Sequence, residues 1–322
     1  MPAVTVDDLL LLDRISRPGP GLAAPRKAVG VVTAQHGTEG AGFPVRRVFP
    51  GALPPQRTDP FLMLDHIGSV EYAPGDAKGA PWHPHRGFET VSYVLDGAIA
   101  HQDSHGGGGV IEDGDTQWMT AGSGILHDEM PTEGMLARGG VMHSFQLWVN
   151  LPARHKWDPP RYQDLCGTSL TLLASADGGA LVRLIAGELD GHTGPGRTVT
   201  PILLLHATLG PGARLELPWP RPFNAFGYVV QGLGTFGSGE RPLVEGQLAC
   251  FGAGDALTVT AAEHQEGPAG TLDVLLFGGR PIREPIAQYG PFVMNTREEI
   301  VEAVADYQSG RIGAVPALAS DG

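Results

Sequence analysis

Residues 82–97, WHPHRGFETVSYVLDG, hold two histidines one residue apart, His83 and His85. In an extended backbone alternate side chains point to the same face, so both imidazoles can reach one metal ion. The run that follows, residues 89–95, is rich in β-branched and aromatic residues and ends at Asp96-Gly97, which is typical of a strand and a turn. The stretch therefore predicts two strands, the first of which presents a pair of metal ligands.

A second pair follows about forty residues later, in AGSGILHDEMP at positions 121–131, where His127 and Glu129 are again two residues apart. A lone His-x-His is common by chance. The second pair favours a metal, because the intervening segment is typical of antiparallel strands that bring the two pairs together. The sequence thus predicts a site of three histidines and one carboxylate. Such ligands suit iron(II), manganese, nickel, copper or zinc, and the absence of a thiolate argues against a purely structural zinc site.

The composition limits the class of protein. A chain of 322 residues is long enough for two domains, and its 47 glycines and 28 prolines indicate many turns and few helices. A net charge of −13 argues against direct binding to nucleic acid. Cys166 and Cys250 show no metal or redox spacing and are interpreted as free thiols. No signal peptide or membrane span is visible, so we expect a cytoplasmic protein with no membrane partner.

The second half repeats the first in outline. Residues 215–232 resemble residues 82–97 when the closing glycines are superposed, and Pro218 and Pro220 then fall where the two histidines stand. On this superposition Gly254-Asp255 is interpreted as the counterpart of Gly114-Asp115, but no His-x-Glu follows it. Proline offers no ligand atom. We therefore expect a second domain that lacks a metal site, packs on the first domain and shapes the mouth of its pocket.

Several polar residues near the site have open roles. His66 is interpreted as a structural hydrogen-bonding residue. His101 and His105 flank a glycine run that predicts a wide hairpin turn, and they are interpreted as surface residues or as residues that surround the ligands. Glu89 either orients a ligand imidazole or forms a surface salt bridge. Residues 143–150 alternate as in a strand, and one of their two faces is expected to line the barrel.

One helix is predicted near the C-terminus. Thr296-Arg-Glu-Glu299 matches a capping box, and Ile300, Val304 and Tyr307 form one apolar stripe. Gly310 suits the left-handed residue that ends a helix. The pattern favours a structural helix that docks on a sheet.

The chain resembles the pirin family. The resemblance is carried by HPHRGFETV at 83–91, GDTQWMTAGSGILHDEM at 114–130, QLWVNLP at 146–152 and YGPFVMNT at 289–296. Pirins are bicupins, so the resemblance implies an all-β fold of two tandem cupin β-sandwich barrels, here with a short C-terminal helix. It also implies a mononuclear metal, usually iron, in the first barrel. The family's ligands fall on His83, His85, His127 and Glu129, the set that the spacing had already selected.

On this basis we expect a metal-binding cupin at 1–155, in which residues 1–42 form a lead segment on which the sequence gives little information. A cupin without a metal site is expected at 156–292, and the helix and tail at 293–322. We expect a monomer.

The resemblance implies two functions, and whether the chain is an enzyme stays open between them. The first is an iron-dependent dioxygenase of the quercetin 2,3-dioxygenase type, which acts with O2 on a flavonol or a similar enediol-like substrate and uses Glu129 as general base. The alternative is a non-enzymatic redox-sensing regulator, in which the state of the iron controls binding to a transcription factor or a metabolic enzyme. A sugar isomerase is less favoured, because no basic cluster for phosphate is present.

Overall fold

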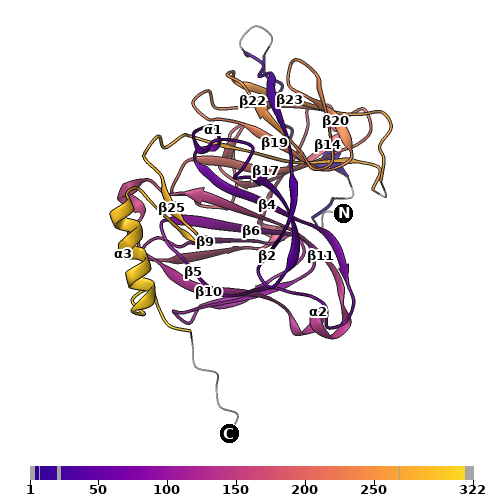
Figure 1. Ribbon diagram of the computed structural model, residues 1–322. Helices are drawn as coiled ribbons and strands as arrows, with labels where there is room; N and C mark the ends of the chain where they lie inside the picture. Colours follow the sequence, from indigo (N-terminus) through magenta and orange to yellow (C-terminus); the bar gives the residue numbers. More distant parts are fainter. Residues whose placement is uncertain (1–3, 7, 20–22, 268, 316–322) are drawn as a thin grey trace. The chain divides into compact units, whose positions relative to one another are not determined.

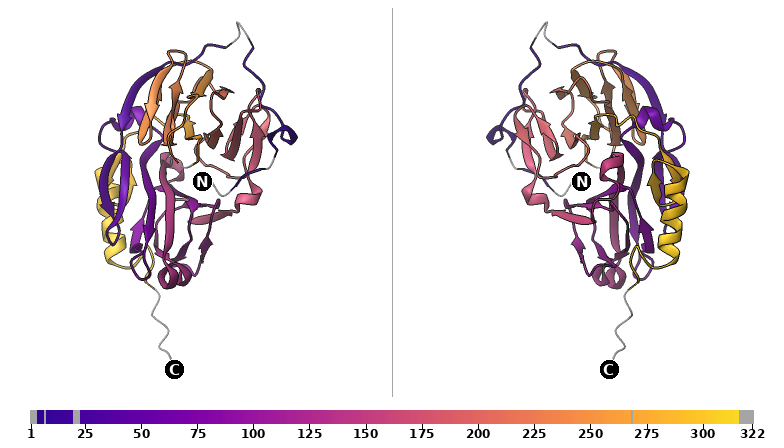
Figure 2. Two further views of the ribbon diagram at one scale, coloured as in Figure 1. Left: turned by 90° about the vertical axis from the view of Figure 1, so that its right-hand side faces the viewer. Right: turned by 90° about the vertical axis from the view of Figure 1, so that its left-hand side faces the viewer.

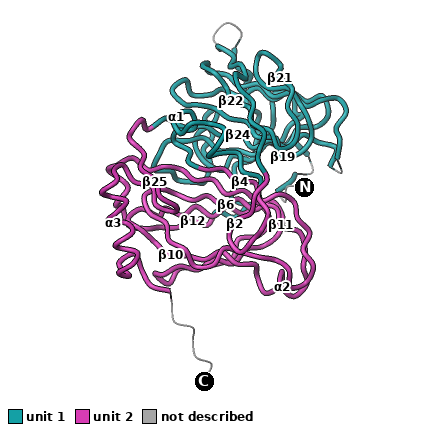
Figure 3. Tube along the Cα trace, in the orientation of Figure 1, with its two compact units in different colours: residues 1–35, 46–62, 165–281 teal, residues 36–45, 63–164, 282–322 magenta. Residues whose placement is uncertain are grey.

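The structure, a computed structural model, describes residues 4–6, 8–19, 23–267 and 269–315. Antiparallel strands dominate it (Figure 1), and the all-β fold predicted from the glycine and proline content is confirmed. The chain forms two compact units (Figure 3): unit 1 with residues 1–35, 46–62 and 165–281, and unit 2 with residues 36–45, 63–164 and 282–322. The domains expected from the sequence are each continuous in sequence, whereas these units are each assembled from several segments. The expected domain limits therefore stay a prediction.

Unit 2 contains most of a seven-stranded and all of a four-stranded antiparallel sheet. The larger sheet has the order β12-β9-β6-β11-β4-β3-β2. Its strands are β2 (Gln35–Glu39), β3 (Phe43–Phe49), β4 (Phe61–Tyr72), β6 (Phe88–Asp96), β9 (Thr116–Thr120), β11 (Gly140–Asn150) and β12 (Arg161–Leu165). The smaller sheet has the order β5-β10-β7-β8, with strands β5 (Ala80–His85), β7 (Ile99–Asp103), β8 (Gly108–Ile111) and β10 (Ile125–Pro131). A separate hairpin joins β25 (Ala287–Tyr289) to β26 (Phe292–Met294).

Unit 1 repeats this plan. Its seven-stranded sheet has the order β1-β22-β19-β24-β17-β14-β13, with strands β1 (Ala28–Thr33), β13 (Thr171–Ala174), β14 (Ala180–Ala186), β17 (Ile202–Leu209), β19 (Phe226–Gln231), β22 (Gln247–Phe251) and β24 (Leu272–Gly279). Its four-stranded sheet has the order β18-β23-β20-β21, with strands β18 (Arg214–Pro218), β20 (Leu233–Phe236), β21 (Arg241–Val244) and β23 (Ala256–Ala261). A short hairpin pairs β15 (Glu188–Leu189) with β16 (His192–Thr193).

The helices are few and short, as the composition predicted. They are α1 (Pro55–Thr58), α2 (Glu133–Arg138), α3 (Arg297–Gln308) and the 3-10 turns Leu9–Leu11, Ala153–His155 and Gly167–Ser169. No helix in the described ranges is long and apolar enough to cross a membrane.

Helix α3 begins with the capping box predicted from the sequence: Thr296 accepts from the amide of Glu299, whose side chain accepts from the amide of Thr296. The helix runs along the outer side of the unit 2 strands (Figure 2). Ile300 and Val304 pack on a small apolar cluster, but the fully buried residue of the helix is Ala303. Tyr307 remains 42% exposed, so the buried stripe is narrower than predicted.

The interior of the unit 1 barrel is apolar where unit 2 carries its histidines. Strands β18 and β23 pair as β5 and β10 do, and their register sets Leu215 opposite Val259 and Leu217 opposite Leu257. All four belong to the buried core of unit 1. Pro218 alternates away from this face and Pro220 lies beyond the end of β18, so the superposition that put these two prolines in place of ligand histidines was wrong. Leucines, rather than prolines, occupy the inward positions.

The same superposition misplaced a turn. The strand that corresponds to β9 is β22, because β9 pairs with β6 as β22 pairs with β19. The turn before β22 lies at Gly246, whereas Gly254-Asp255 comes after that strand. Gly254-Asp255 therefore does not correspond to Gly114-Asp115.

Candidate metal centre

The two predicted ligand strands are neighbours. Strands β5 and β10 pair antiparallel, with His83 opposite His127 and His85 opposite Ile125. Residues opposite each other in an antiparallel pair share a face, so the three histidines point to the same side of the sheet. Pro84 is compatible with strand β5 because this strand lies at the edge of its sheet, where a missing amide donor costs no ladder hydrogen bond.

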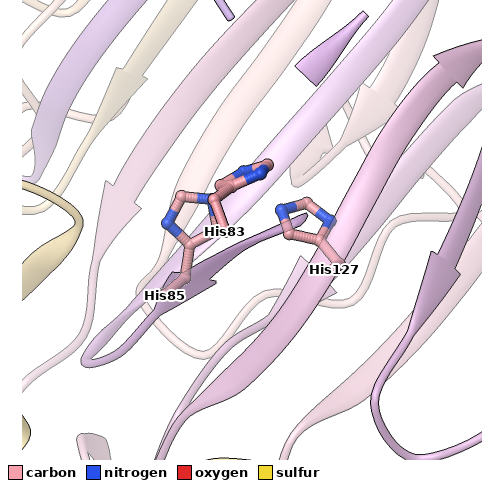
Figure 4. Close-up of side chains that lie close together, drawn as sticks. All are labelled: His83, His85 and His127. Atoms are coloured by element: carbon pink, nitrogen blue, oxygen red, sulfur yellow. The ribbon is translucent and has the colours of Figure 1, made fainter. Parts of the chain in front are cut away.

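The three imidazoles converge. One ring nitrogen from each of His83, His85 and His127 lies within 4.8 Å of the other two, and Figure 4 shows the rings turned toward one another. Their centroids are 4.4 to 4.9 Å apart. The Nδ1 atom of His83 lies 2.8 Å from the carbonyl oxygen of Pro81, so an Nδ1–H that donates there leaves Nε2 with its lone pair for a metal.

Burial keeps the inner imidazoles neutral. Desolvation, with the nearby His83 and His127 as further causes, lowers the pKa of His85 well below its usual value. Desolvation likewise lowers the pKa of His127 to about 4. Both rings are buried, and none of their nitrogens has a hydrogen-bond partner. Neutral nitrogens that are buried without partners fit a divalent metal, which accepts their lone pairs.

Glu129 lies on the same strand, two residues after His127, across a register shift in the pairing with β5. It is not part of the group of three converging ligands. Its Oε1 accepts from the hydroxyl of Ser92 at 3.0 Å and its Oε2 from the amide of Gln146 at 3.1 Å. Burial alone would raise the pKa of Glu129, but His127, His83 and these two hydrogen bonds outweigh it and hold the pKa below its ordinary value. The carboxylate is therefore oriented and ionised. Its role as the fourth ligand stays a prediction.

The wall of the site comes from strands β6 and β11 of the larger sheet. Their register sets Ser92 opposite Gln146, so the barrel-lining face of residues 143–150 is the one with Ser144, Gln146 and Trp148. The rings of Phe88 and Trp148 lie 5.1 and 5.3 Å from that of His85 and close the site on one side with apolar surface. Sequence alternation allowed either face, and only the cross-strand register selects one.

Glu89 does not serve the ligands in either way that the sequence suggested. On strand β6 its side chain points to the other face of the sheet from that of Ser92, away from the site. It is fully buried there, which excludes a surface salt bridge. There its Oε1 accepts from the hydroxyl of Thr120 at 2.7 Å. His66 has the structural role predicted, because its Nε2 lies 2.8 Å from Nε2 of His143. His105 is exposed, whereas His101 is buried and faces the site.

Comparison with known proteins identifies the family. The family model described as pirin matches residues 42–149, and the model described as the pirin C-terminal cupin domain matches residues 204–313. The chain belongs to the pirin family. It is 43% identical to a pirin-like protein of Solanum lycopersicum over 290 residues, which cover 90% of this chain and 94% of that protein. It is 38% identical to the pirin of Homo sapiens over 295 residues, covering 91% and 96%.

A solved structure gives the same result for the fold. This pirin superposes on a crystal structure of quercetin 2,3-dioxygenase from Acinetobacter baumannii with a TM-score of 0.84 at 34% identity, covering 91% of this chain and all of the other. The tandem cupin fold expected from the sequence is thereby confirmed. The histidine cluster of this pirin is a candidate metal site within that fold.

Proposed function

We propose that this pirin is an iron-dependent dioxygenase of the quercetin 2,3-dioxygenase type, which acts on a flavonol or a similar enediol-like substrate. The observation that carries the proposal is the set of three converging imidazoles, two of them buried without hydrogen-bond partners, beside an oriented carboxylate inside a barrel. The similarity to a solved structure of that name supports the reaction class. The free thiols of Cys166 and Cys250 support a location in the reducing cytoplasm.

His83, His85 and His127 would hold the ion, with Glu129 as the fourth ligand. Iron(II), when bound, supplies the one-electron chemistry that lets a closed-shell organic substrate react with dioxygen. The apolar surface of Phe88 and Trp148 excludes water from the side of His85.

Glu129 is the group in this site that is suited to take the proton of a substrate hydroxyl. It is ionised, and its two oxygens are held by Ser92 and Gln146 within hydrogen-bond distance. A general base needs such a fixed position next to the proton that it removes. The deprotonated oxygen is then the better electron donor in the oxidation.

The test compares wild type with Glu129→Gln. Glutamine keeps the shape and a carbonyl oxygen but removes the charge and the basicity, while three histidines remain to hold a divalent ion. Oxygen uptake on a flavonol, divided by iron content, is expected to fall by a factor on the order of 100 or more, because general-base catalysis typically contributes 10²–10⁴-fold.

Asp128→Asn is the matched control, since Asp128 is the adjacent carboxylate, alternates to the other face of β10 and bonds to Gln102. Its turnover per iron is expected to stay at the wild-type value. An unchanged ratio in Glu129→Gln would show that Glu129 is a ligand only. No iron-dependent uptake by wild type on any flavonol would refute the proposed reaction.

A further inference from the structure

The smaller sheet of unit 2 places a fourth histidine inside the metal barrel. Strand β7 pairs with β10 on the side away from β5, with His101 opposite Glu129 and Asp103 opposite His127. Because opposed residues share a face, His101 points to the same interior as the metal-site histidines. It is 5% exposed, and neither of its ring nitrogens has a hydrogen-bond partner. Yet His101 lies outside the group of converging ligands.

The ring of Tyr162 lies over this imidazole. The two centroids are 5.5 Å apart and the planes are inclined by 31°. Tyr162 comes from β12 in the opposite sheet and packs against a cluster that contains Ile125, which shares the inward face of β10 with the ligands. Its hydroxyl is buried. Burial, and after it the nearby Asp103 carboxylate, raises the pKa of Tyr162, but the geometry of the two groups does not meet that of a hydrogen bond.

Buried polar groups without partners are costly, and a native barrel retains them where a ligand completes them. The imidazole of His101 and the hydroxyl of Tyr162 are both buried, and burial disfavours the charged form of either group. A neutral imidazole has one donor and one acceptor, and a phenol hydroxyl has both functions. The neighbouring carboxylates of Glu129 and Asp103 disfavour an anionic ligand. The chemistry fits a neutral hydroxyl-bearing ligand.

We infer that His101 and Tyr162 are substrate-positioning residues that hydrogen bond to one phenolic or enolic oxygen of a flavonol-like ligand in the metal barrel. The inference rests on the proposed function for the class of ligand. Strand β10 then presents a metal ligand and the general base, while its neighbour β7 presents the residue that fixes the substrate beside them. A phenolic hydroxyl donates to the free imidazole nitrogen and accepts from the Tyr162 hydroxyl.

The test measures the Kd of quercetin for the iron-loaded protein without oxygen, by the absorption shift of the flavonol, together with iron content. Tyr162→Phe removes only a hydroxyl, and His101→Leu removes the ring nitrogens at similar volume. Each is expected to weaken binding about 5- to 10-fold, the effect of one neutral hydrogen bond, with iron content unchanged. Because both residues bind one oxygen, the double variant is expected to lose less than the product of the two single losses.

The controls carry the same chemical changes outside the pocket. Tyr93→Phe changes a buried tyrosine on the face of β6 opposite Ser92, and His105→Leu changes an exposed histidine in the turn after β7. Both are expected to bind quercetin as wild type does. Wild-type affinity in Tyr162→Phe and His101→Leu, or losses that only follow lost iron, would overturn the inference while leaving the reaction intact. If wild type binds quercetin tightly through both residues but takes up no oxygen with it, the proposed reaction is refuted and the inference is supported. A wild type that binds no quercetin would refute both.

Discussion

At the scale of single residues, burial of His127 makes the metal-free protein less stable in acid. Its pKa is about 4 in the folded chain against about 6.5 when exposed, so between these values the unfolded chain binds more protons. The contribution of this residue to stability is therefore present above pH 6.5 and is lost as the pH falls toward 4. The loss is about 3 kcal/mol, since one pKa unit corresponds to about 1.4 kcal/mol.

The measurement is urea unfolding of chelator-treated protein at pH 7 and pH 4, for wild type and His127→Gln. Glutamine does not titrate, so the variant is expected to lose about 3 kcal/mol less between the two pH values than wild type does. Equal losses in the two proteins would show that the imidazole is already charged or exposed in the folded metal-free chain.

The ligand histidines were predictable from the sequence because a spacing of two puts side chains on one strand face whatever the rest of the fold does. The residues that orient Glu129 were not. Ser92 and Gln146 come from strands of the larger sheet, and their meeting depends on cross-strand register, which no local pattern encodes. The same holds for His101: the sequence left open whether it lies on the surface or surrounds the ligands, and the pairing of β7 with β10 sets it opposite Glu129.

At the scale of elements, a buried ion pair joins helix α3 to the residue that follows strand β5. Arg86, which directly follows His85, donates from Nη2 to Asp306 at 2.8 Å and from Nε to the carbonyl of Ser123 at 2.7 Å. The two side chains of the pair are only 4% and 12% exposed. The capping box predicted where α3 begins. No local pattern showed that Asp306, which lies among the apolar residues of the helix, would be buried against an arginine 220 positions away.

Asp306→Ala leaves the Arg86 guanidinium buried without its carboxylate. Breaking such a pair from one side costs roughly 3–5 kcal/mol, so exchange of the α3 amides with deuterium is expected to accelerate roughly 100-fold or more. Glu302→Ala is the control, because Glu302 is exposed on the same helix and its loss is expected to change exchange little. Slow exchange in Asp306→Ala would show that the apolar contacts of Ala303 and its neighbours hold the helix without the ion pair.

At the scale of the whole chain, the sequence predicted two barrels of one plan but not which segments build them. Residues 1–35 belong to the same unit as residues 165–281, because strand β1 pairs with β22. Residues 282–322, with α3, belong to the unit of the metal strands. Pairing between segments that are far apart in sequence depends on register and on long loops, and no local sequence pattern encodes it. The repeat of the plan was visible because each half contains its own strand-and-turn pattern.

The two barrels differ in what fills them, and this predicts the metal stoichiometry of the whole chain. The inward positions of β18 and β23 hold Leu215, Leu217, Leu257 and Val259, whose side chains offer no ligand atom. We therefore expect one tightly held iron per chain in wild type. The double variant His83→Ala/His127→Ala is expected to retain less than a tenth of it, because a single histidine and a carboxylate remain at the site.

The measurement is iron content by mass spectrometry after dialysis against excess metal and then against a weak chelator. His192→Ala/His264→Ala removes two histidines of unit 1 that do not converge with other ligands among the described residues, and it is expected to keep the full stoichiometry. A second tightly bound iron in wild type would place a metal in unit 1. The same conclusion would follow if iron persisted in the His83/His127 variant but was lost from the His192/His264 variant. In that case, side chains outside the apolar interior of β18 and β23 would have to supply the ligands.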